Sequence, residues 1–351
     1  MSRLRRCSDR STAPTSTSCG VLRPLRSVII RVRPRVHIGL LSMHAGAPRM
    51  NGGIGFSVEA PLARLDISAA DRTAICDSRP VPMGADEQAQ LIKGISHFAD
   101  MHKIVQGVHI EITGAMRTHV GMGSATALRL GSIEGLAKLN GLQLPRDALI
   151  KASGRGGTSG IGINSYFEGG MICDLGRAAD GARHAPSSIV LSAHSPLALP
   201  MIEMPPWPIL LCIPRAIVPK SQIEEIAFFS RTAPLPAPAS FKACYIALFG
   251  IYAAVRERNY TAFCDGIDAM QDTDWKRAER AEYGDTLAGV STVLRANGAD
   301  CVGMSSLGPM LFCFAPAQRM AALVAAAHVL DCDSYLTVPA NQGREVIYND
   351  A

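Results

Sequence analysis

The spacing of hydrophobic residues divides the first half of the chain into short strands and helices. SVIIRVRPRVHIGLL, residues 27–41, is rich in β-branched residues and predicts a strand, with Pro34 at an edge or bulge because proline has no N–H to donate. GIGFSV and ARLDIS are further short strand candidates, and GVHIEITG alternates apolar and polar residues as a half-buried strand does. Residues 87–103 carry Leu91, Ile95 and Phe98 at helical spacing, which predicts a helix.

The second half of the pattern is mainly helical. Proline is dense between Pro186 and Pro219, where a linker is expected, and WPILLCIP within that stretch would be the first strand of a second domain. Helices are predicted at 241–258, 260–270 and 275–297, then a strand in MLFCFAP, a helix near 317–329 and a final strand pair. Because the strands and helices follow no regular βαβ repeat, the pattern favours an α+β fold over a doubly wound sheet.

Length and composition predict how many domains the chain contains. The chain has 351 residues, 48% hydrophobic and 19% charged, which is typical of a globular protein with a sizeable core. That length predicts two domains. We place a basic tail at residues 1–26, an N-terminal domain at 27–200 and a C-terminal domain at 201–351.

The net charge of +5 lies entirely in the tail. Residues 1–26 hold six arginines against Asp9, so the rest of the chain has 29 basic and 29 acidic residues (35 minus 6 and 30 minus 1). A neutral body gives no support for a polyanion-binding surface, so no nucleic-acid partner is expected. The tail has the composition of a disordered arm or a transit peptide, but a start assigned too far upstream explains it best.

The cysteine pattern and the hydropathy of the sequence indicate the cellular compartment of the protein. The ten cysteines include no C-x-x-C pair and no zinc-like spacing, so they are expected to be buried thiols in a reducing environment. No continuous apolar run approaches the roughly 20 residues that span a bilayer. We therefore expect a cytoplasmic protein with no membrane partner.

Three glycine-rich loops carry the candidate chemistry. They are GMGSATA at 121–127, where Ser124 is the expected N-cap of a helix ending at Asn140-Gly141, GRGGTSGIG at 154–162, and GMSSLGP at 303–309. One such loop is more often a tight turn than a binding site. Three loops rich in Ser or Thr, one of them with Arg155 between glycines, indicate binding of more than one phosphate.

The motif order also resembles a known superfamily. RPRVHIGLL, VGMGSATAL and GMSSLGPMLF resemble the three motifs of GHMP kinases, whose middle motif is a glycine-serine loop before a helix. RVHIGLL followed by PRMNGGIGFSVEAP, GRGGTSGIGINSYFEGGMICDLG and GMSSLGPMLFCF is similar to the β-ribofuranosylaminobenzene 5'-phosphate synthase family. The similarity runs from about residue 28 to the C-terminus.

The resemblance implies a two-domain GHMP-kinase-like α+β fold with the active site in the cleft between the domains. It implies condensation of 5-phosphoribosyl 1-pyrophosphate with 4-aminobenzoate, or a close para-substituted benzoate, in tetrahydromethanopterin biosynthesis. Carbon dioxide and pyrophosphate leave, with Mg²⁺ as cofactor and no ATP. A homodimer is expected.

The loops and the matched motifs together indicate roles for individual residues. Catalytic roles are expected for His37, Arg155 and Asp174. Glu168 and Asp174 flank a glycine pair and are candidates for Mg²⁺ binding, although either reads equally well as a solvated turn carboxylate, and for Glu168 that is the stronger reading. Arg35 and His37 are expected on one face of a strand because they are two residues apart. The predicted phosphate-binding residues are Arg35, Arg49, Gly121, Gly123, Ser124, Gly156, Gly157, Thr158, Ser159, Ser305 and Ser306.

One position departs from the family. Ser42 stands where archaeal members usually carry an acidic residue, which puts the role of a carboxylate there in doubt. Two alternatives stay open beside the synthase. One is an ATP-dependent small-molecule kinase of the same superfamily, and the other is a catalytically silent paralogue that binds a phosphorylated metabolite or a partner protein.

Overall fold

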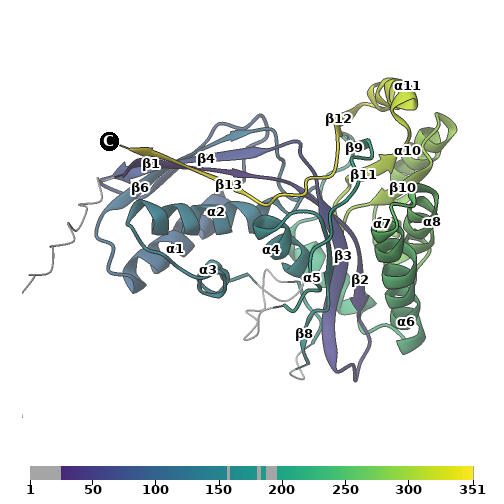
Figure 1. Ribbon diagram of the computed structural model, residues 1–351, viewed down its shortest axis with the longest axis horizontal. Coiled ribbons are helices and arrows are strands. Elements are labelled where there is room, and N and C mark those ends of the chain that lie inside the picture. The colour runs from purple at the N-terminus through teal and green to yellow at the C-terminus, as the bar shows by residue number, and fades with distance from the viewer. Residues whose placement is uncertain (1–24, 156–158, 180–182, 187–195, 351) are drawn as a thin grey trace, which may run out of the picture.

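A computed structural model describes residues 25–155, 159–179, 183–186 and 196–350. Its largest sheet has five strands in the order β13-β1-β4-β6-β5. These strands are β1 (Leu25–Val32), β4 (Ala63–Ala70), β5 (Ala74–Asp77), β6 (Gly107–Gly114) and β13 (Glu345–Asp350). Two helices, α1 (Ala85–Met101) and α2 (Ser124–Leu139), cover one face of it (Figure 1). The strand expected in GVHIEITG and the helix expected near 87–103 are confirmed.

Pro34 separates two strands that the hydrophobic pattern joined into one. β1 ends at Val32, and β2 (Arg35–Ser42) begins a second sheet in the order β2-β3-β7. The other strands are β3 (Arg49–Ser57), β7 (Met171–Asp174) and the short β8 (Arg177–Ala178), which pairs with β3. The single strand expected over 27–41 is therefore wrong, because a proline without an N–H group allows the chain to leave the first sheet there.

The third sheet lies at the other end of the molecule, in the order β10-β11-β9-β12. Its strands are β9 (Ile209–Pro214), β10 (Cys301–Met304), β11 (Leu311–Phe314) and β12 (Cys332–Thr337). Most of the nearby helices lie on its outer side (Figure 1). The helices after residue 200 are α5 (Gln222–Thr232), α6 (Ala237–Tyr245), the π-helical η2 (Ile246–Tyr252), α7 (Ala253–Arg256), α8 (Tyr260–Gln271), α9 (Asp274–Ala281), α10 (Gly284–Ala296) and α11 (Ala317–Val329). The α+β architecture is confirmed, and the helix expected over 275–297 is two helices.

α6, η2 and α7 form one continuous helix. This helix, Ala237–Arg256, is the one helix among the described residues that is long and apolar enough to cross a membrane by length and composition. Lys242 interrupts its apolar residues, so the helix contains no continuous apolar run of about 20 residues. Core helices of soluble proteins meet the same criterion, and this helix packs against β2 and α8.

The last strand of the chain returns to the first sheet. β13 pairs antiparallel with β1, whereas β12 pairs with β9 in the third sheet (Figure 1). The expected final strand pair is therefore wrong, because β12 and β13 lie in different sheets. Residues 201–351 thus contribute one strand to the sheet built mainly by residues 27–200, and the predicted division at residue 200 stays a prediction.

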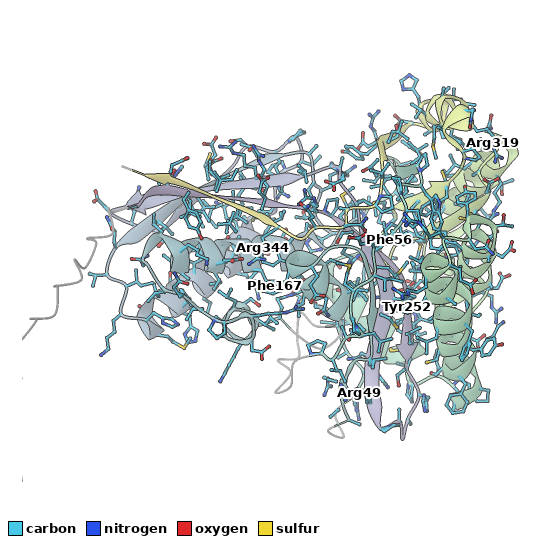
Figure 2. All side chains as sticks on the ribbon, viewed as in Figure 1. Arg49, Phe56, Phe167, Tyr252, Arg319 and Arg344 are labelled. Atoms are coloured by element: carbon cyan, nitrogen blue, oxygen red, sulfur yellow. The ribbon has the colours of Figure 1, made fainter. Side chains whose placement is uncertain are left out.

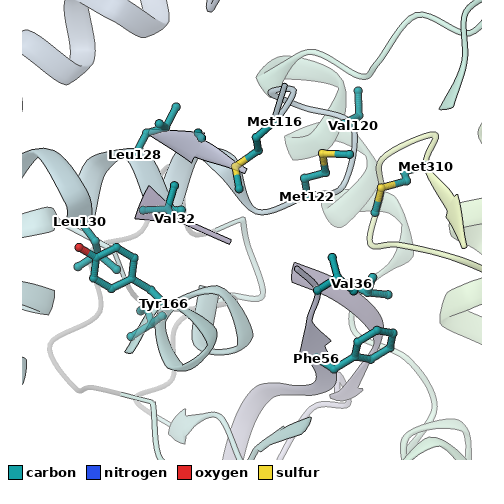
Figure 3. Packing of buried hydrophobic residues seen from close by; sticks show 14 of the residues in the cluster. Val32, Val36, Phe56, Met116, Val120, Met122, Leu128, Leu130, Tyr166 and Met310 are labelled. Atoms are coloured by element: carbon teal, nitrogen blue, oxygen red, sulfur yellow. The ribbon is translucent and has the colours of Figure 1, made fainter. Parts of the chain in front are cut away.

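A continuous apolar core connects the sheets. Phe56 on β3 packs edge-on to Phe312, with ring centroids 6.1 Å apart, and lies 5.9 Å from the ring of Phe314. Val120 and Met122, in the loop before α2, lie near Met310 in the same cluster (Figure 3). This packing holds the glycine-rich loops before α2 and after β10 against each other, and it fixes the geometry of the site.

Candidate active site

A polar cavity, here called the anion cavity, forms where the glycine-rich loops meet. The start of β2, the first turn of α2, the loop after β10 and helix α5 all contribute to its wall, and its free volume is about 140 Å³. The polar residues and glycines that line it include Arg35, His37, His119, Gly121, Gly123, Ser124, Thr126, Arg155, Ser159, Lys220, Glu225, Glu279 and Ser306. The structure thus brings together residues of all three loops, as the sequence predicted.

The α2 helix begins differently from the prediction. Its N-cap is Gly123, in the left-handed region with φ 73°, and Ser124 is the first helical residue, so the predicted Ser124 cap is wrong. No side chain caps this end of α2 among the described residues. A Cβ atom on Gly123 would lie 2.7 Å from Cγ of Arg35, which explains the glycine. Ser124, Ala125 and Thr126 of this first turn line the cavity, where an anion can accept from uncapped N–H groups.

Ser305 joins two of the loops instead of facing a ligand. Its buried hydroxyl donates to the carbonyl oxygen of Gly121 at 2.7 Å and accepts from the backbone N–H of His37 at 2.9 Å. Because these contacts use both its donor and an acceptor position, the predicted phosphate contact of Ser305 has no support in the geometry. Its neighbour Ser306 lines the cavity.

Two arginines give the cavity its positive charge. Arg35 donates through Nη1 to the carbonyl oxygen of Gly121 at 2.5 Å, and its Nε has no hydrogen-bond partner among the described residues. Arg155 donates to Thr126 Oγ1 and to Ser159 Oγ, both at 3.1 Å. Burial lowers the pKa of each guanidinium to about 10, so both remain cationic at neutral pH. Within the described part of the chain neither forms an ion pair, so a bound anion would supply the missing countercharge.

His37 contributes a neutral ring. It lies on β2 two residues after Arg35, and both side chains line the cavity as expected from the strand period. Burial, with the nearby charges of Arg35 and Lys276, holds the pKa of His37 well below its ordinary value. Its Nδ1 has no partner within the described residues, so the ring can donate to or accept from a ligand without carrying charge.

The two predicted metal carboxylates lie outside the anion cavity. Asp174 is buried at the end of β7, accepts from the N–H of Gly176 at 2.8 Å, and sits where a Cβ on Gly160 would overlap it. Glu168, at the end of α4 (Gly160–Phe167), pairs with Arg146 at the start of α3 (Arg146–Ser153). The structure does not bring these two into a shared metal site, and the described residues contain no group of three or more metal-ligating side chains.

Arg49 also points away from the cavity. Its guanidinium donates to the carbonyl oxygens of Leu175 at 2.9 Å and Gly176 at 2.6 Å, near the far end of the β2–β3 hairpin (Figure 2). The hydroxyl of Ser42 donates to the carbonyl oxygen of Arg49 at 2.6 Å. Both residues hold the hairpin together, so the predicted phosphate contact of Arg49 has no support, and the departure at Ser42 lies outside the anion cavity.

Three of the predicted residues cannot be placed. Gly156, Gly157 and Thr158 fall outside the described residues, while Ser159 at the end of the same loop accepts from Arg155. The cavity-facing glycine of this loop that is described is Gly162, next to Thr126.

Glu225 was not among the predicted site residues. This residue of α5 lines the cavity, and no hydrogen bond or ion pair joins its carboxylate to another described residue. Burial raises the pKa of its carboxyl group, opposed by the charges of Arg155, His119 and Arg35. The one local signal was the Ser221–Glu224 capping box, which fixes the start of α5 and therefore the face on which Glu225 lies.

Comparison with known proteins supports the fold. A family model described as the GHMP kinases N terminal domain matches residues 90–170, which include the α2 loop. Solved structures with the same fold include a homoserine kinase from Cytophaga hutchinsonii, at TM-score 0.62 and 16% identity over 96% of this chain and 100% of that one. Another is the L. major mevalonate kinase, at TM-score 0.66 and 14% identity over 89% and 96%. The chain thus has the GHMP-kinase fold.

Within that fold the chain is similar to a particular group of synthases. It is 27% identical over 325 residues to a protein of Archaeoglobus fulgidus named beta-ribofuranosylphenol 5'-phosphate synthase, covering 90% of this chain and 98% of that one. A protein of the same name from Methanothermobacter thermautotrophicus is 26% identical over 81% and 88%. The resemblance predicted from the motifs is confirmed, and it supports an enzyme of related function. The names of these relatives contain a phenol where the sequence resemblance implied an aminobenzene.

Proposed function

We propose that the protein transfers a phosphoribosyl group from 5-phosphoribosyl 1-pyrophosphate to the ring carbon of a para-substituted benzoate, releasing carbon dioxide and pyrophosphate. The observation that carries the proposal is the anion cavity, where, among the described residues, Arg35 and Arg155 form no ion pair and no side chain caps the N-terminus of α2. A donor with a 5-phosphate and a pyrophosphate needs such a concentration of N–H donors and cations.

The names of the relatives reduce the number of candidate acceptors. A ribofuranosylphenol product corresponds to an acceptor with a para-hydroxyl group, and the sequence resemblance implied the para-amino compound. We therefore take 4-hydroxybenzoate and 4-aminobenzoate as the two acceptors to compare. A role in tetrahydromethanopterin biosynthesis, a cytoplasmic location and a homodimer belong to the same proposal.

The proposed reaction makes one carbon–carbon bond and breaks another. The bond between C1 of the ribose and pyrophosphate breaks, and its electron pair leaves with pyrophosphate. The ring carbon that carries the carboxylate then bonds to C1, and loss of carbon dioxide returns an electron pair to the ring. Negative charge grows on pyrophosphate during this reaction, and the guanidinium groups of Arg35 and Arg155 are placed to stabilise it.

The cavity also contains a donor for the Mg²⁺ that the proposal includes. Mg²⁺ is usually held by one or two carboxylates together with substrate phosphates. Glu225 provides a carboxylate in the cavity that has no partner among the described residues, whereas both oxygens of Glu279 accept hydrogen bonds, from Trp275 Nε1 and Lys276 Nζ. Bound there, the ion would neutralise charge on the leaving pyrophosphate.

The proposal is tested by release of labelled carbon dioxide. The full chain is incubated with Mg²⁺, 5-phosphoribosyl 1-pyrophosphate and carboxyl-labelled 4-hydroxybenzoate or 4-aminobenzoate. Release that requires the sugar pyrophosphate supports the synthase, and its absence with both acids contradicts it.

A kinase is the second candidate, because solved homoserine and mevalonate kinases share the fold. It predicts that ATP with Mg²⁺ raises the melting temperature more than the sugar pyrophosphate with Mg²⁺ does. The synthase predicts the opposite order. Stabilisation by the sugar pyrophosphate without release of carbon dioxide would instead indicate a binding paralogue.

A further inference from the structure

A second cavity, here called the side pocket, opens from the anion cavity between α1, α2 and α5. The two share His119, Ala125, Arg155 and Glu225 in their walls. The free volume of the side pocket is about 80 Å³, which corresponds to several water molecules, and one aromatic ring can displace them.

Arg129 gives the side pocket a cation that forms no ion pair among the described residues. It lies on α2, three residues after Thr126, and its guanidinium forms no hydrogen bond with any residue that the structure describes. The carboxylate of Glu87 in the same wall is held by His119 at 3.3 Å. Burial lowers the pKa of Arg129, and its charge also lowers the pKa of Arg155. Two neighbouring guanidinium groups that form no ion pair within the described residues favour a bound anion.

The rest of the wall differs from that of the anion cavity. Met83, Leu91 and Leu128 present buried apolar side chains to the side pocket, and Gln90 adds an amide. A phosphate group gains no binding free energy from an apolar surface, whereas a flat apolar ring is stabilised when it is buried there. A nucleotide base has no negative group for Arg129. The combination of an apolar slot and one unpaired guanidinium suits an aromatic carboxylate.

We propose that the side pocket binds the aromatic acid, with its carboxylate on Arg129 and its ring against Met83, Leu91 and Leu128. The inference rests on the proposed function and assigns the acceptor subsite within it. The donor occupies the anion cavity, so the carboxylate end of the acid meets the sugar at the shared wall. The para substituent then points away from the donor, toward an amide that can pair with a hydroxyl or an amino group.

The test is Arg129→Gln, measured with matched ligands that differ in charge. Calorimetry gives Kd for 4-hydroxybenzoate and for 4-hydroxybenzamide, and steady-state kinetics give KM for the acid and for 5-phosphoribosyl 1-pyrophosphate. In the wild type the acid should bind at least about tenfold more tightly than the amide, the usual size of one charge-assisted hydrogen bond. In Arg129→Gln this preference should disappear, with KM for the sugar pyrophosphate changed by less than about twofold. A general loss of structure would weaken both ligands equally and leave the preference intact.

Arg183→Gln is the matched control. Arg183 lines a third cavity together with His44, Met50 and Phe229, and this cavity is another apolar space beside an arginine. If Arg183→Gln removes the preference for the carboxylate and Arg129→Gln does not, the acceptor binds there and the inference is wrong. If Arg129→Gln keeps full preference while the wild type releases carbon dioxide, the inference fails and the proposed function stands. If the wild type releases no carbon dioxide, both the inference and the proposed function are wrong.

Discussion

Ser305 and Gly121 lie in direct contact although 184 residues separate them, with the serine hydroxyl donating to the glycine carbonyl at 2.7 Å. Gly121 has φ 100°, and a Cβ atom there would overlap the carbonyl oxygen of Ser305. A glycine at position 121 therefore allows the loop that contains Ser305 to approach the backbone closely. Since both loops border the anion cavity, the shape of the cavity depends on this contact.

Gly121→Ala should destabilise the protein more than an ordinary glycine substitution does. An alanine at positive φ costs about 1 kcal/mol, and the overlap with Ser305 adds a cost of about the same size or larger. Gly141→Ala is the control, because Gly141 has φ 68° and no atom within 4 Å of its Cβ position. Urea unfolding of both variants measures the difference. Equal losses in free energy of unfolding would show that the two loops separate easily.

Arg155→Ala should leave the fold intact and reduce catalytic efficiency at least about tenfold, because an anionic substrate loses a charge-assisted contact. Arg155→Lys should restore only part of the catalytic efficiency, since a lysine ammonium group cannot donate two parallel hydrogen bonds to a pair of oxygens as a guanidinium does. Thr126→Val removes the Oγ1 acceptor that holds Nε of Arg155 at 3.1 Å. This variant keeps the cation, so its loss should be smaller. Kinetics at saturating acid measure all three variants, and full activity in Arg155→Ala would place substrate binding elsewhere.

Local patterns were enough to predict some elements. β6 alternates its buried and exposed residues, and α1 buries Leu91, Ile95 and Phe98 along one stripe. Both signals depend only on neighbours in sequence. The α+β class and the grouping of the three loops followed from the same local signals together with the motif order.

The features that local patterns did not predict depend on contacts between residues far apart in the sequence. β13 finds its partner in β1 at the other end of the chain, and nothing within its own six residues distinguishes that sheet from the one that contains β12. Glu225 reaches the anion cavity because α5 packs across it. Asp174 was expected in the site because it follows a glycine pair, but the fold buries it under Gly160. Sequence spacing contains no information on such placements.

His119 should titrate above its ordinary range. Its hydrogen bond with Glu87 raises the pKa, and burial opposes the shift in part. A raised pKa means that the pair stabilises the fold below pH 6.5 and that this contribution is lost as the pH rises through the folded-state pKa. The side chain of His119 is 51% exposed, so the effect on stability is small. NMR titration of the His119 ring in the wild type and in Glu87→Gln measures the shift, and an unchanged pKa in the variant would contradict it.

Asp174→Asn should make the protein more stable at pH 8 than the wild type and about equally stable at pH 4. Burial raises the pKa of Asp174 to about 7. A carboxyl group with a raised pKa binds its proton more tightly in the folded state, so ionisation lowers stability as the pH rises from about 4 to about 7. Asparagine does not ionise, and its oxygen can still accept the N–H of Gly176 that Asp174 accepts at 2.8 Å.

The difference in free energy of unfolding between Asp174→Asn and the wild type should therefore grow between pH 4 and pH 8, by on the order of a few kcal/mol. Urea unfolding at both values measures it, and a difference that does not change with pH would show that the carboxyl group is solvated. Because Asp174 lies outside the anion cavity, the variant should also keep its activity within a few-fold. A folded Asp174→Asn protein without turnover would show that this carboxylate reaches the substrate, as the sequence predicted.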